Sequence, residues 1–409
     1  MARTGRILHV LSQRPGRTGS GVTLEALVQQ AASRGWEQRA VVGTSCDDIE
    51  PGVAGLCAEH IHPLVFGRPS DGLGFALPGM SDVMPYDSSR FADLDPEEIA
   101  RYLEAWEQVL GRVLVEFEPD LIHAHHLWLV SSSIRDLAPH TPLVLHCHTT
   151  GFRQMALCPH LAGRVCAGCS RADRFLVLAA EHARQLASEL GVDPGRVHVV
   201  GAGYCEEIFS AEGRKPVPGR MVYAGKLARA KGLDCLLDAF ALLRDRVKGA
   251  ELHAAGSGSG AESEALELRL QSMPGVVWHG PLSQPDLAAL LRTAHSFVLP
   301  SFYEGLGLVL IEALACGCRL VATRSSGVEE QIAPFLGREL DLVELPPMSS
   351  IDEPLPGEVP GFVQRLAVGL ERSLARHPLE AGELPDLSAF SWRAVFERIE
   401  SVWRELLGG

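Results

Sequence analysis

The chain lacks clustered positive charge. It has 37 lysine and arginine residues against 51 aspartate and glutamate residues, which gives a formal net charge of -14. No segment is rich in lysine or arginine. Nucleic acids and anionic membrane surfaces attract concentrated positive charge. The composition therefore disfavours nucleic-acid binding and electrostatic docking on a membrane.

Long apolar runs and a dense set of cysteines are also missing. No stretch approaches the roughly 20 apolar residues that cross a bilayer. The first residues, "MARTGRILHV", lead into a strand pattern without the apolar core of a signal peptide. Ten cysteines among 409 residues do not indicate a disulfide framework. We expect a cytoplasmic protein with reduced thiols and no integral membrane segment.

The sequence does contain strands and helices that alternate along most of its length. A chain of 409 residues exceeds one compact core, so two domains are expected. A proline- and glycine-containing break at 201–220 separates two such series, and 44–95 is irregular. The expected strands are 6–12, 38–43, 120–126, 142–148, 174–179 and 196–201, then 220–225, 251–256, 276–280, 296–300 and 319–323. This alternation predicts an α/β fold with two parallel sheets, each covered on both faces.

Two carboxylates stand out in "PSFYEGLGLVLIEALACG". Glu304 follows an apolar strand, and Glu312 lies inside the helix that the loop opens. Gly305 and Gly307 let backbone N–H groups approach a ligand, and the N-terminus of a helix favours an anion. A carboxylate further along the helix can accept hydrogen bonds from a diol. The layout suits a diphosphate flanked by hydroxyl-rich groups, as in a nucleotide-sugar.

Two lysines add positive charge in the same half of the chain. In "YAGKLARAKGLDCLLDAF", Lys226 follows a strand and Lys231 precedes a helix start. Their ammonium groups near a helix N-terminus can neutralise a diphosphate. Solvated surface lysines are the alternative.

Several motifs in order carry a resemblance to a known family. They are "GKLARAKGLDCLLDAF", "LHAAGSGSG", "WHGPLS" and "VLPSFYEGLGLVLIEALACGCRLVATRSSGVEE". Over about 215–335 the chain resembles the nucleotide-sugar domain of the retaining glycosyltransferases of family 4. The remainder is collinear but weaker. The resemblance implies the GT-B architecture, in which two Rossmann-like, doubly wound domains face a cleft.

The resemblance also implies domain limits. Residues 1–200 would form the acceptor-side domain, and 201–385 would form the nucleotide-sugar domain. The terminal segment 386–409 would cross back to the first domain, and the helical spacing of its apolar residues requires one buried face.

Site roles follow from the resemblance position by position. Lys226 and Lys231 would hold the diphosphate, Glu304 would contact the sugar, and Glu312 would bind the ribose hydroxyls. Family members usually carry arginine where Lys226 stands, so a point charge replaces a bidentate clamp. The other implied donor contacts are Gly19 and Gly21 in the N-terminal loop, Leu282 in "HGPL" near the base, and Gly305, Leu306 and Gly307. The resemblance implies that four of these residues take part in catalysis: His148, Glu304, Lys226 and Lys231.

Histidines gather at the ends of two expected strands. The resemblance places His148 at the sugar end of the donor, with His125 beside it. We interpret His123 and His146 as core residues that alternate with His125 and His148 along each strand. His125, His126 and His148, with Arg153 and Gln154, are the candidate acceptor contacts.

Two other motifs are explained by packing or turn formation more simply than by ligand binding. "CPHLAGRVCAGC" offers Cys158, His160, Cys166 and Cys169 as a possible zinc set, although buried thiols are favoured and no metal is assigned. "GSGSGA" (256–261) has the spacing of a dinucleotide fingerprint. A lone glycine match is weak, and we interpret it as a turn beside the nucleotide.

The sequence therefore predicts a glycosyltransferase that moves a sugar from an NDP-sugar, with a UDP-sugar favoured, to a soluble small-molecule or glycan acceptor. Retention and independence from a metal or other cofactor are family-level expectations, with the two lysines supplying charge. A sugar-nucleotide epimerase or phosphorylase on the same fold remains an alternative. So does a non-catalytic nucleotide-sugar-binding protein.

Overall fold

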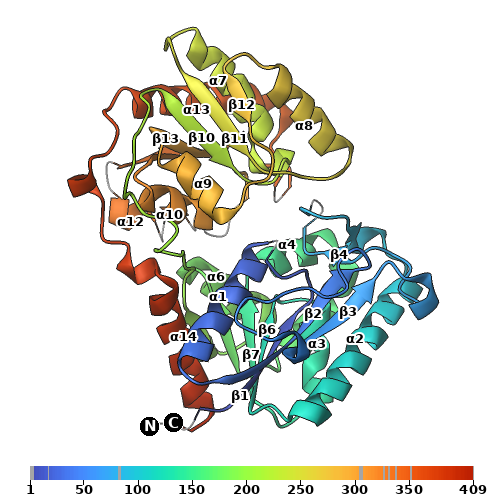
Figure 1. Ribbon diagram of the computed structural model, residues 1–409. Coiled ribbons are helices and arrows are strands. Elements are labelled where there is room, and N and C mark those ends of the chain that lie inside the picture. The colour runs from blue at the N-terminus through green and yellow to red at the C-terminus, as the bar shows by residue number, and fades with distance from the viewer. Residues whose placement is uncertain are drawn as a thin grey trace. The chain divides into compact units, whose positions relative to one another are not determined.

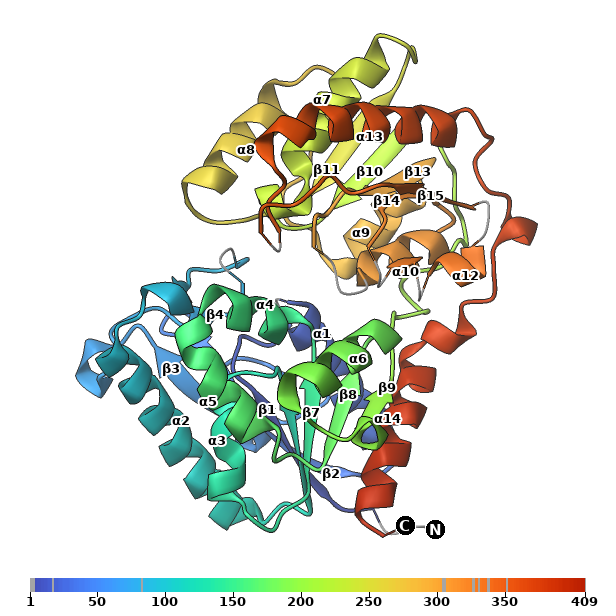
Figure 2. The ribbon, with the colours of Figure 1, turned by 180° about the vertical axis from the view of Figure 1, so that it is seen from behind.

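The chain forms two compact units, shown together in Figure 1 and from behind in Figure 2. The structure is a computed structural model that describes residues 4–16, 18–81, 84–303, 307–325, 328–329, 332–336, 339–350 and 352–408. Unit 1 comprises residues 1–203 and 392–409, and unit 2 comprises residues 204–391.

Unit 1 is built on a seven-stranded sheet in the order β3-β2-β1-β6-β7-β8-β9. All its neighbouring strands are parallel. The strands are β1 (Arg6–Leu11), β2 (Glu37–Ser45), β3 (Ile61–Phe66), β6 (Leu121–His125), β7 (Leu143–Cys147), β8 (Arg174–Val177) and β9 (Val197–Val199). A separate two-stranded sheet pairs β4 (Pro78–Gly79) with β5 (Ser89–Arg90).

Strand β3 corrects the expectation that 44–95 is irregular. It pairs with β2 over six residues, Ile61 to Phe66. Pro63 interrupts the apolar pattern and offers no N–H for a ladder. Proline is tolerated there because β3 lies at the edge of the sheet, where one side needs no partner.

Helices cover both faces of the unit 1 sheet. On one face, α2 (Pro96–Phe117), α3 (Leu129–Leu137), α5 (Pro159–Cys169) and α6 (Ala180–Leu190) pack on a continuous apolar core. On the other face lie α1 (Gly19–Ser33) and the C-terminal helix α14 (Trp392–Leu406). A short helix, α4 (Thr150–Leu157), follows β7. Helix α2 begins at a capping box in which Asp95 and Glu98 each accept the other's backbone N–H.

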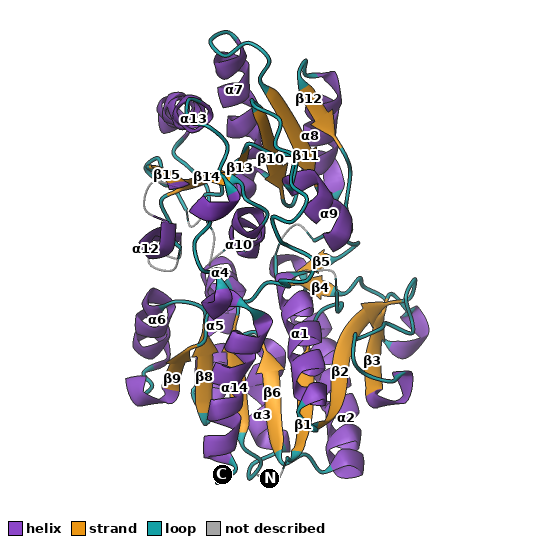
Figure 3. Cartoon of the chain, turned by 60° about the vertical axis from the view of Figure 1, so that its left-hand side comes forward, coloured by secondary structure: helices purple, strands orange, loops and turns teal. Residues whose placement is uncertain are grey.

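Helix α14 returns to unit 1 from the far end of the chain and lies in front of its strands in Figure 3. Trp403 is fully buried, and its ring meets that of Trp36 edge-on at 5.5 Å. Glu400 accepts hydrogen bonds from Nε1 of Trp36 at 2.9 Å and from Arg34 at 2.6 Å. Apolar burial and a satisfied buried carboxylate together hold the helix in place.

Unit 2 repeats the architecture with six parallel strands in the order β12-β11-β10-β13-β14-β15. The strands are β10 (Arg220–Ala224), β11 (Glu251–Ala255), β12 (Val276–Trp278), β13 (Ser296–Leu299), β14 (Arg319–Thr323) and β15 (Leu340–Val343). Helices α7 (Leu233–Arg244), α8 (Gly260–Ser272) and α13 (Val359–Leu374) share one core. The helices α9 (Gln284–Leu291), α10 (Leu308–Ala315) and α12 (Ala333–Leu336) also belong to this unit.

The expectation of two doubly wound parallel sheets is confirmed. The sequence did not reveal β15, which has only four residues and adds to the sheet edge beside β14. Within the described part of the chain, no helix is long and apolar enough to cross a membrane.

Candidate active site

Each sheet has a point at which the strand order reverses. In unit 1 it lies between β1 and β6, and in unit 2 between β10 and β13. Ligands of open α/β sheets bind outside the carboxyl ends of the strands at such a point, because the loops there diverge. The loops after these four strands are therefore the places where site residues are expected.

In unit 2, the loop after β10 carries both lysines. Lys226 follows the strand by two residues, and Lys231 ends a 3-10 turn before α7. Both are half-buried. Gly232 has φ +67°, and a Cβ there would lie 2.1 Å from the carbonyl oxygen of Pro300 in the loop after β13. The two switch-point loops thus pack directly against each other.

Glu312 lies on α10, the helix after β13. Burial raises the pKa of its carboxyl from 4.5 to about 7. The carboxyl makes no hydrogen bond or ion pair with any residue that the structure describes. Burying a carboxyl group without a hydrogen-bond partner costs free energy. The hydroxyl groups of a ligand could donate to it and offset that cost.

Other predicted donor contacts are only partly visible. Gly307 is the N-cap of α10 and has φ +72°, a conformation that favours glycine. Glu304, Gly305 and Leu306 lie outside the described residues. Leu282 is half-buried between β12 and α9.

The glycines of "GSGSGA" serve close backbone packing. Gly256 has φ +133°, and a Cβ there would lie 1.8 Å from the carbonyl oxygen of Gly225, next to Lys226. A Cβ on Gly258 would lie 2.9 Å from the carbonyl oxygen of Leu227. The loop after β11 therefore abuts the lysine-bearing loop, which explains its glycines without a dinucleotide.

In unit 1, the loop after β1 leads into the N-terminus of α1. Thr18 caps this helix by accepting a hydrogen bond from the N–H of Gly21. A Cβ on Gly21 would lie 2.6 Å from the backbone nitrogen of Gly16, so the loop folds tightly over the helix start. Nothing described lies within 4 Å of a Cβ placed on Gly19, which leaves that backbone approachable.

His126 joins three segments of unit 1. Its Nε2 lies 3.0 Å from the hydroxyl of Ser20 in α1, and its Nδ1 lies 3.0 Å from the hydroxyl of Thr150 in α4. Its φ of +72° is rare for a residue with a side chain. Both ring nitrogens are engaged within the chain, which favours a structural role over acceptor binding.

Four histidines share one face of the unit 1 sheet: His123, His125, His146 and His148. This corrects the expectation that the side chains of His123 and His146 alternate with those of His125 and His148. The rings of His123 and His125 stack at 4.9 Å, and those of His146 and His148 stack at 4.4 Å. Residues two apart on a strand point to the same side, so a pattern of every second residue gives a stack. The core expectation for His123 and His146 agrees with their burial.

Burial dominates the electrostatics of this histidine stack. It lowers the pKa of His148 from 6.5 to about 3 and that of His9 to about 4. Burial also lowers the pKa values of His123, His125 and His146 well below the ordinary value. All five rings are therefore neutral near pH 7.

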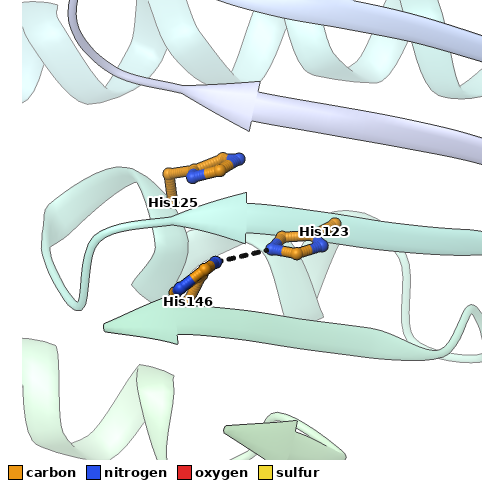
Figure 4. A group of neighbouring side chains, drawn as sticks. All are labelled: His123, His125 and His146. Carbon is orange, nitrogen blue, oxygen red and sulfur yellow. Dashed lines mark hydrogen bonds between the residues drawn. The ribbon is translucent and has the colours of Figure 1, made fainter. Parts of the chain in front are cut away.

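Three of these histidines, shown in Figure 4, bring ring nitrogens within 4.8 Å of one another: His123, His125 and His146. A zinc ion would need one bare lone pair from each ring. Nε1 of Trp403, which can only donate, lies 3.2 Å from Nδ1 of His123. His123 therefore carries its hydrogen on Nε2, the nitrogen that faces His146, so the three rings do not offer a metal three lone pairs.

The cysteine motif does not assemble a zinc set. Cys158 and Cys169 are fully buried, whereas His160 is exposed. The Sγ of Cys166 contacts Sδ of Met155, and that of Cys169 contacts the carbonyl of Trp128. Burial raises the pKa of the Cys169 thiol well above its usual range. The described contacts of Cys166 and Cys169 are those of packed thiols.

Arg153 and Gln154 lie in α4 and are buried. Oε1 of Gln154 lies 3.9 Å from the Cys158 thiol. Arg153 brings a cation into the segment that begins at His148.

Sequence reasoning missed His9 and Trp403 as members of the histidine stack. The alternating pattern of "RILHVLS" could have placed His9 on this face, whereas no local signal links Trp403 to β6.

Comparison with known proteins identifies the family to which this chain is similar. Residues 18–203 match the model of the glycosyl transferase 4-like domain, and residues 218–341 match that of the glycosyl transferases group 1. D-inositol 3-phosphate glycosyltransferase 1 of Catenulispora acidiphila is 30% identical over 342 residues, which are 73% of this chain and 78% of the relative.

Solved structures share the fold. Sucrose-phosphate synthase from Thermosynechococcus elongatus has a TM-score of 0.68 at 17% identity, with 99% of this chain and 100% of that chain covered. HepE from Anabaena, in complex with UDP and glucose, has a TM-score of 0.57 at 15% identity, with 97% and 98% covered. The chain belongs to the group 1 glycosyl transferases of family 4 and has their GT-B fold.

Proposed function

We propose that this glycosyltransferase takes its sugar from a UDP-sugar and transfers it, with retention, to a small phosphorylated polyol. The observation that supports the donor is the buried carboxyl of Glu312, which has no hydrogen-bond partner among the described residues and whose pKa burial raises to about 7. Ribose hydroxyls that donate to this group would favour its ionised form and would offset the cost of its burial.

The lysines supply the charge that the leaving diphosphate needs. Lys226 and Lys231 lie in the loop after β10, beside the loop that leads to α10. As the bond to the sugar breaks, negative charge grows on the diphosphate oxygens, and fixed cations stabilise it. In this proposal, the acceptor hydroxyl attacks from the face that the diphosphate leaves, and the leaving phosphate oxygen takes its proton.

The proposed acceptor is supported by the name of a related protein and by the position of one arginine in this chain. The related protein of Catenulispora acidiphila is named for D-inositol 3-phosphate. In this chain, Arg153 lies in the first helix after His148. A guanidinium near a helix start suits a phosphate group, because both favour anions. This proposal narrows the expected soluble acceptor to an anionic polyol.

A product assay tests the proposal. The protein is incubated with UDP-, GDP- and ADP-sugars, each with inositol 3-phosphate or with unphosphorylated inositol. Mass spectrometry then follows the glycoside and the free nucleotide. We expect a glycosylated polyol phosphate with the UDP-sugar, and loss of turnover in Glu304→Ala. Free epimerised nucleotide-sugar, sugar 1-phosphate, or UDP binding without turnover would each reject the transferase assignment to these substrates.

A second assay separates the two acidic roles. Glu312→Ala is expected to weaken binding of UDP and of the UDP-sugar together, because it is assigned to the ribose. Glu304→Ala should lower turnover and leave the affinity for free UDP nearly unchanged. Titration calorimetry with UDP measures both, and an equal loss of affinity in the two variants would contradict the division.

A further inference from the structure

The hydrogen bonds of the histidine stack have directions that the structure determines. The indole N–H of Trp403 donates to Nδ1 of His123. A neutral imidazole donates from one nitrogen and accepts at the other. Nε2 of His123 therefore donates to Nδ1 of His146, 3.3 Å away. His146 must then carry its own hydrogen on Nε2.

A second pair lies in the same stack. Nδ1 of His125 lies 3.0 Å from Nε2 of His148, and their rings are nearly parallel at 5.2 Å. The distance alone does not say which ring donates. If His125 donates, then His148 carries its hydrogen on Nδ1. If His148 donates, then its Nδ1 is a bare acceptor.

Three buried ring nitrogens decide between these directions. Nε2 of His125, Nε2 of His146 and Nδ1 of His9 have no hydrogen-bond partner among the described residues. Nε2 of His146 is an N–H by the argument above. Nδ1 of His9 is bare, because Nε2 of His9 lies 2.9 Å from the amide oxygen of Gln38 and donates to it.

The direction of the second pair then follows from counting donors. If His148 donated, Nε2 of His125 would be a second buried N–H in the stack without an acceptor. If His125 donates, its Nε2 is a bare lone pair, and among the described residues the N–H of His146 is the one N–H of the stack left without an acceptor. Buried N–H groups without acceptors are rarer than acceptors without donors. The geometry favours donation from His125 to His148.

We propose that His125 donates to His148 and holds it with its hydrogen on Nδ1, while Trp403 separately sets the tautomers of His123 and His146. Resting on the proposed function, in which His148 meets the sugar, this makes His148 a hydrogen-bond donor to a sugar oxygen and not a base. His125 is then a positioning residue for His148, whereas the series that begins at Trp403 ends at His146, whose Nε2 has no partner among the described residues.

The histidine tautomers provide a test that does not depend on activity. Long-range proton–nitrogen NMR of the full chain with labelled histidine reports which ring nitrogen carries each hydrogen. We expect Nε2–H at His123 and His146, and Nδ1–H at His125 and His148. Signals are assigned by single His→Asn variants. A hydrogen on Nε2 of His148 in the wild-type chain would overturn the proposal.

A pair of tryptophan variants tests whether the two histidine pairs are independent. Trp403→Phe keeps an aromatic ring and removes the N–H that donates to His123. Without it, His123 and His146 can reverse, and we expect mixed tautomers at these two rings and an unchanged Nδ1–H at His148. Trp36→Phe is the matched control, because it removes an indole N–H that donates to Glu400 on the same helix and lies outside the histidine stack.

Kinetics check the same independence. We expect Trp403→Phe and Trp36→Phe to lose stability and to keep the kcat and the donor KM of the wild type. A shift of the His148 hydrogen to Nε2 in Trp403→Phe, but not in Trp36→Phe, would overturn the separation of the two pairs. If no nucleotide-sugar is turned over, the proposed function fails while the wild-type tautomers still decide the assignment.

Discussion

A Cβ on Gly168 would lie 2.3 Å from the carbonyl oxygen of Ser132. Helices α5 and α3 therefore pack backbone to backbone at this glycine. We expect Gly168→Ala to destabilise unit 1 by about 2 kcal/mol or more, because the backbone of α3 must shift. Gly163→Ala, on the same helix with nothing within 4 Å, should instead stabilise it by about 0.5–1 kcal/mol. Denaturant unfolding measures both, and a loss in both variants would contradict this account.

Glu312 should oppose stability while serving binding. Its folded pKa is raised from 4.5 to about 7, so between these values the unfolded state releases a proton that the folded state keeps. Stability is therefore lost as pH rises from 4.5 to 7. We expect Glu312→Gln to be more stable than wild type at pH 8, by up to about 3 kcal/mol, and equal to it at pH 4. The variant should also bind UDP more weakly.

Unfolding of the unliganded protein across this pH range measures the effect. Glu371→Gln, which removes an exposed partner of Arg246, is the control and should leave the pH dependence unchanged. Parallel stability curves for wild type and Glu312→Gln would show that the carboxyl is solvated in the folded protein.

The histidine stack should make unit 1 sensitive to acid. Burial lowers the pKa of His9 from 6.5 to about 4, so the unfolded state binds more protons below pH 6.5. Stability is present above that pH and falls as pH drops toward 4, by about 3 kcal/mol from His9 alone. We expect His9→Phe to flatten this dependence while lowering stability at pH 7.5, because Gln38 loses its donor.

Unfolding at pH 7.5 and pH 5 tests the acid prediction. The solvent-exposed His140 provides the control, and His140→Asn should leave the pH slope unchanged. A His9→Phe slope equal to that of the wild type would mean that His9 charges without cost in the folded state.

Unit 1 should not bind anionic lipid through α2. This helix carries five glutamates and two arginines, which repels a negative surface. In flotation with anionic vesicles, the protein should stay at the bottom of the gradient. Stoichiometric flotation would contradict this prediction and would support a lipid-linked sugar acceptor instead. Neutral vesicles serve as the control for binding through apolar contacts.

Local signals predicted the regular elements well. Helix α2 has a clear local start signal, because Asp95 and Glu98 form a capping box, and a positive φ at Glu118 ends it. Strand β3 was missed because Pro63 breaks its pattern, and edge position in a sheet is not a local property. Short β15 was missed because its pairing with β14, far along the chain, defines it.

The candidate site was predictable in residue type more than in arrangement. The sequence singled out Glu312, but its desolvation depends on the packing of α10. The stack of His123 and His125 follows from strand periodicity once that rule is applied correctly. The bond between Trp403 and His123 joins residues 280 positions apart, and no pattern in either segment indicates it.

The division of the chain has a consequence for synthesis on the ribosome. Unit 1 is discontinuous, because its last helix, α14, follows the whole of unit 2. When residues 1–203 emerge, Trp36 and the histidine face of the sheet still lack the helix that buries them. Unit 2, whose residues are contiguous, can close its core first. Unit 1, which begins before unit 2, is therefore completed after it, and nascent chains must keep an apolar face of unit 1 uncovered until unit 2 and α14 have both been made.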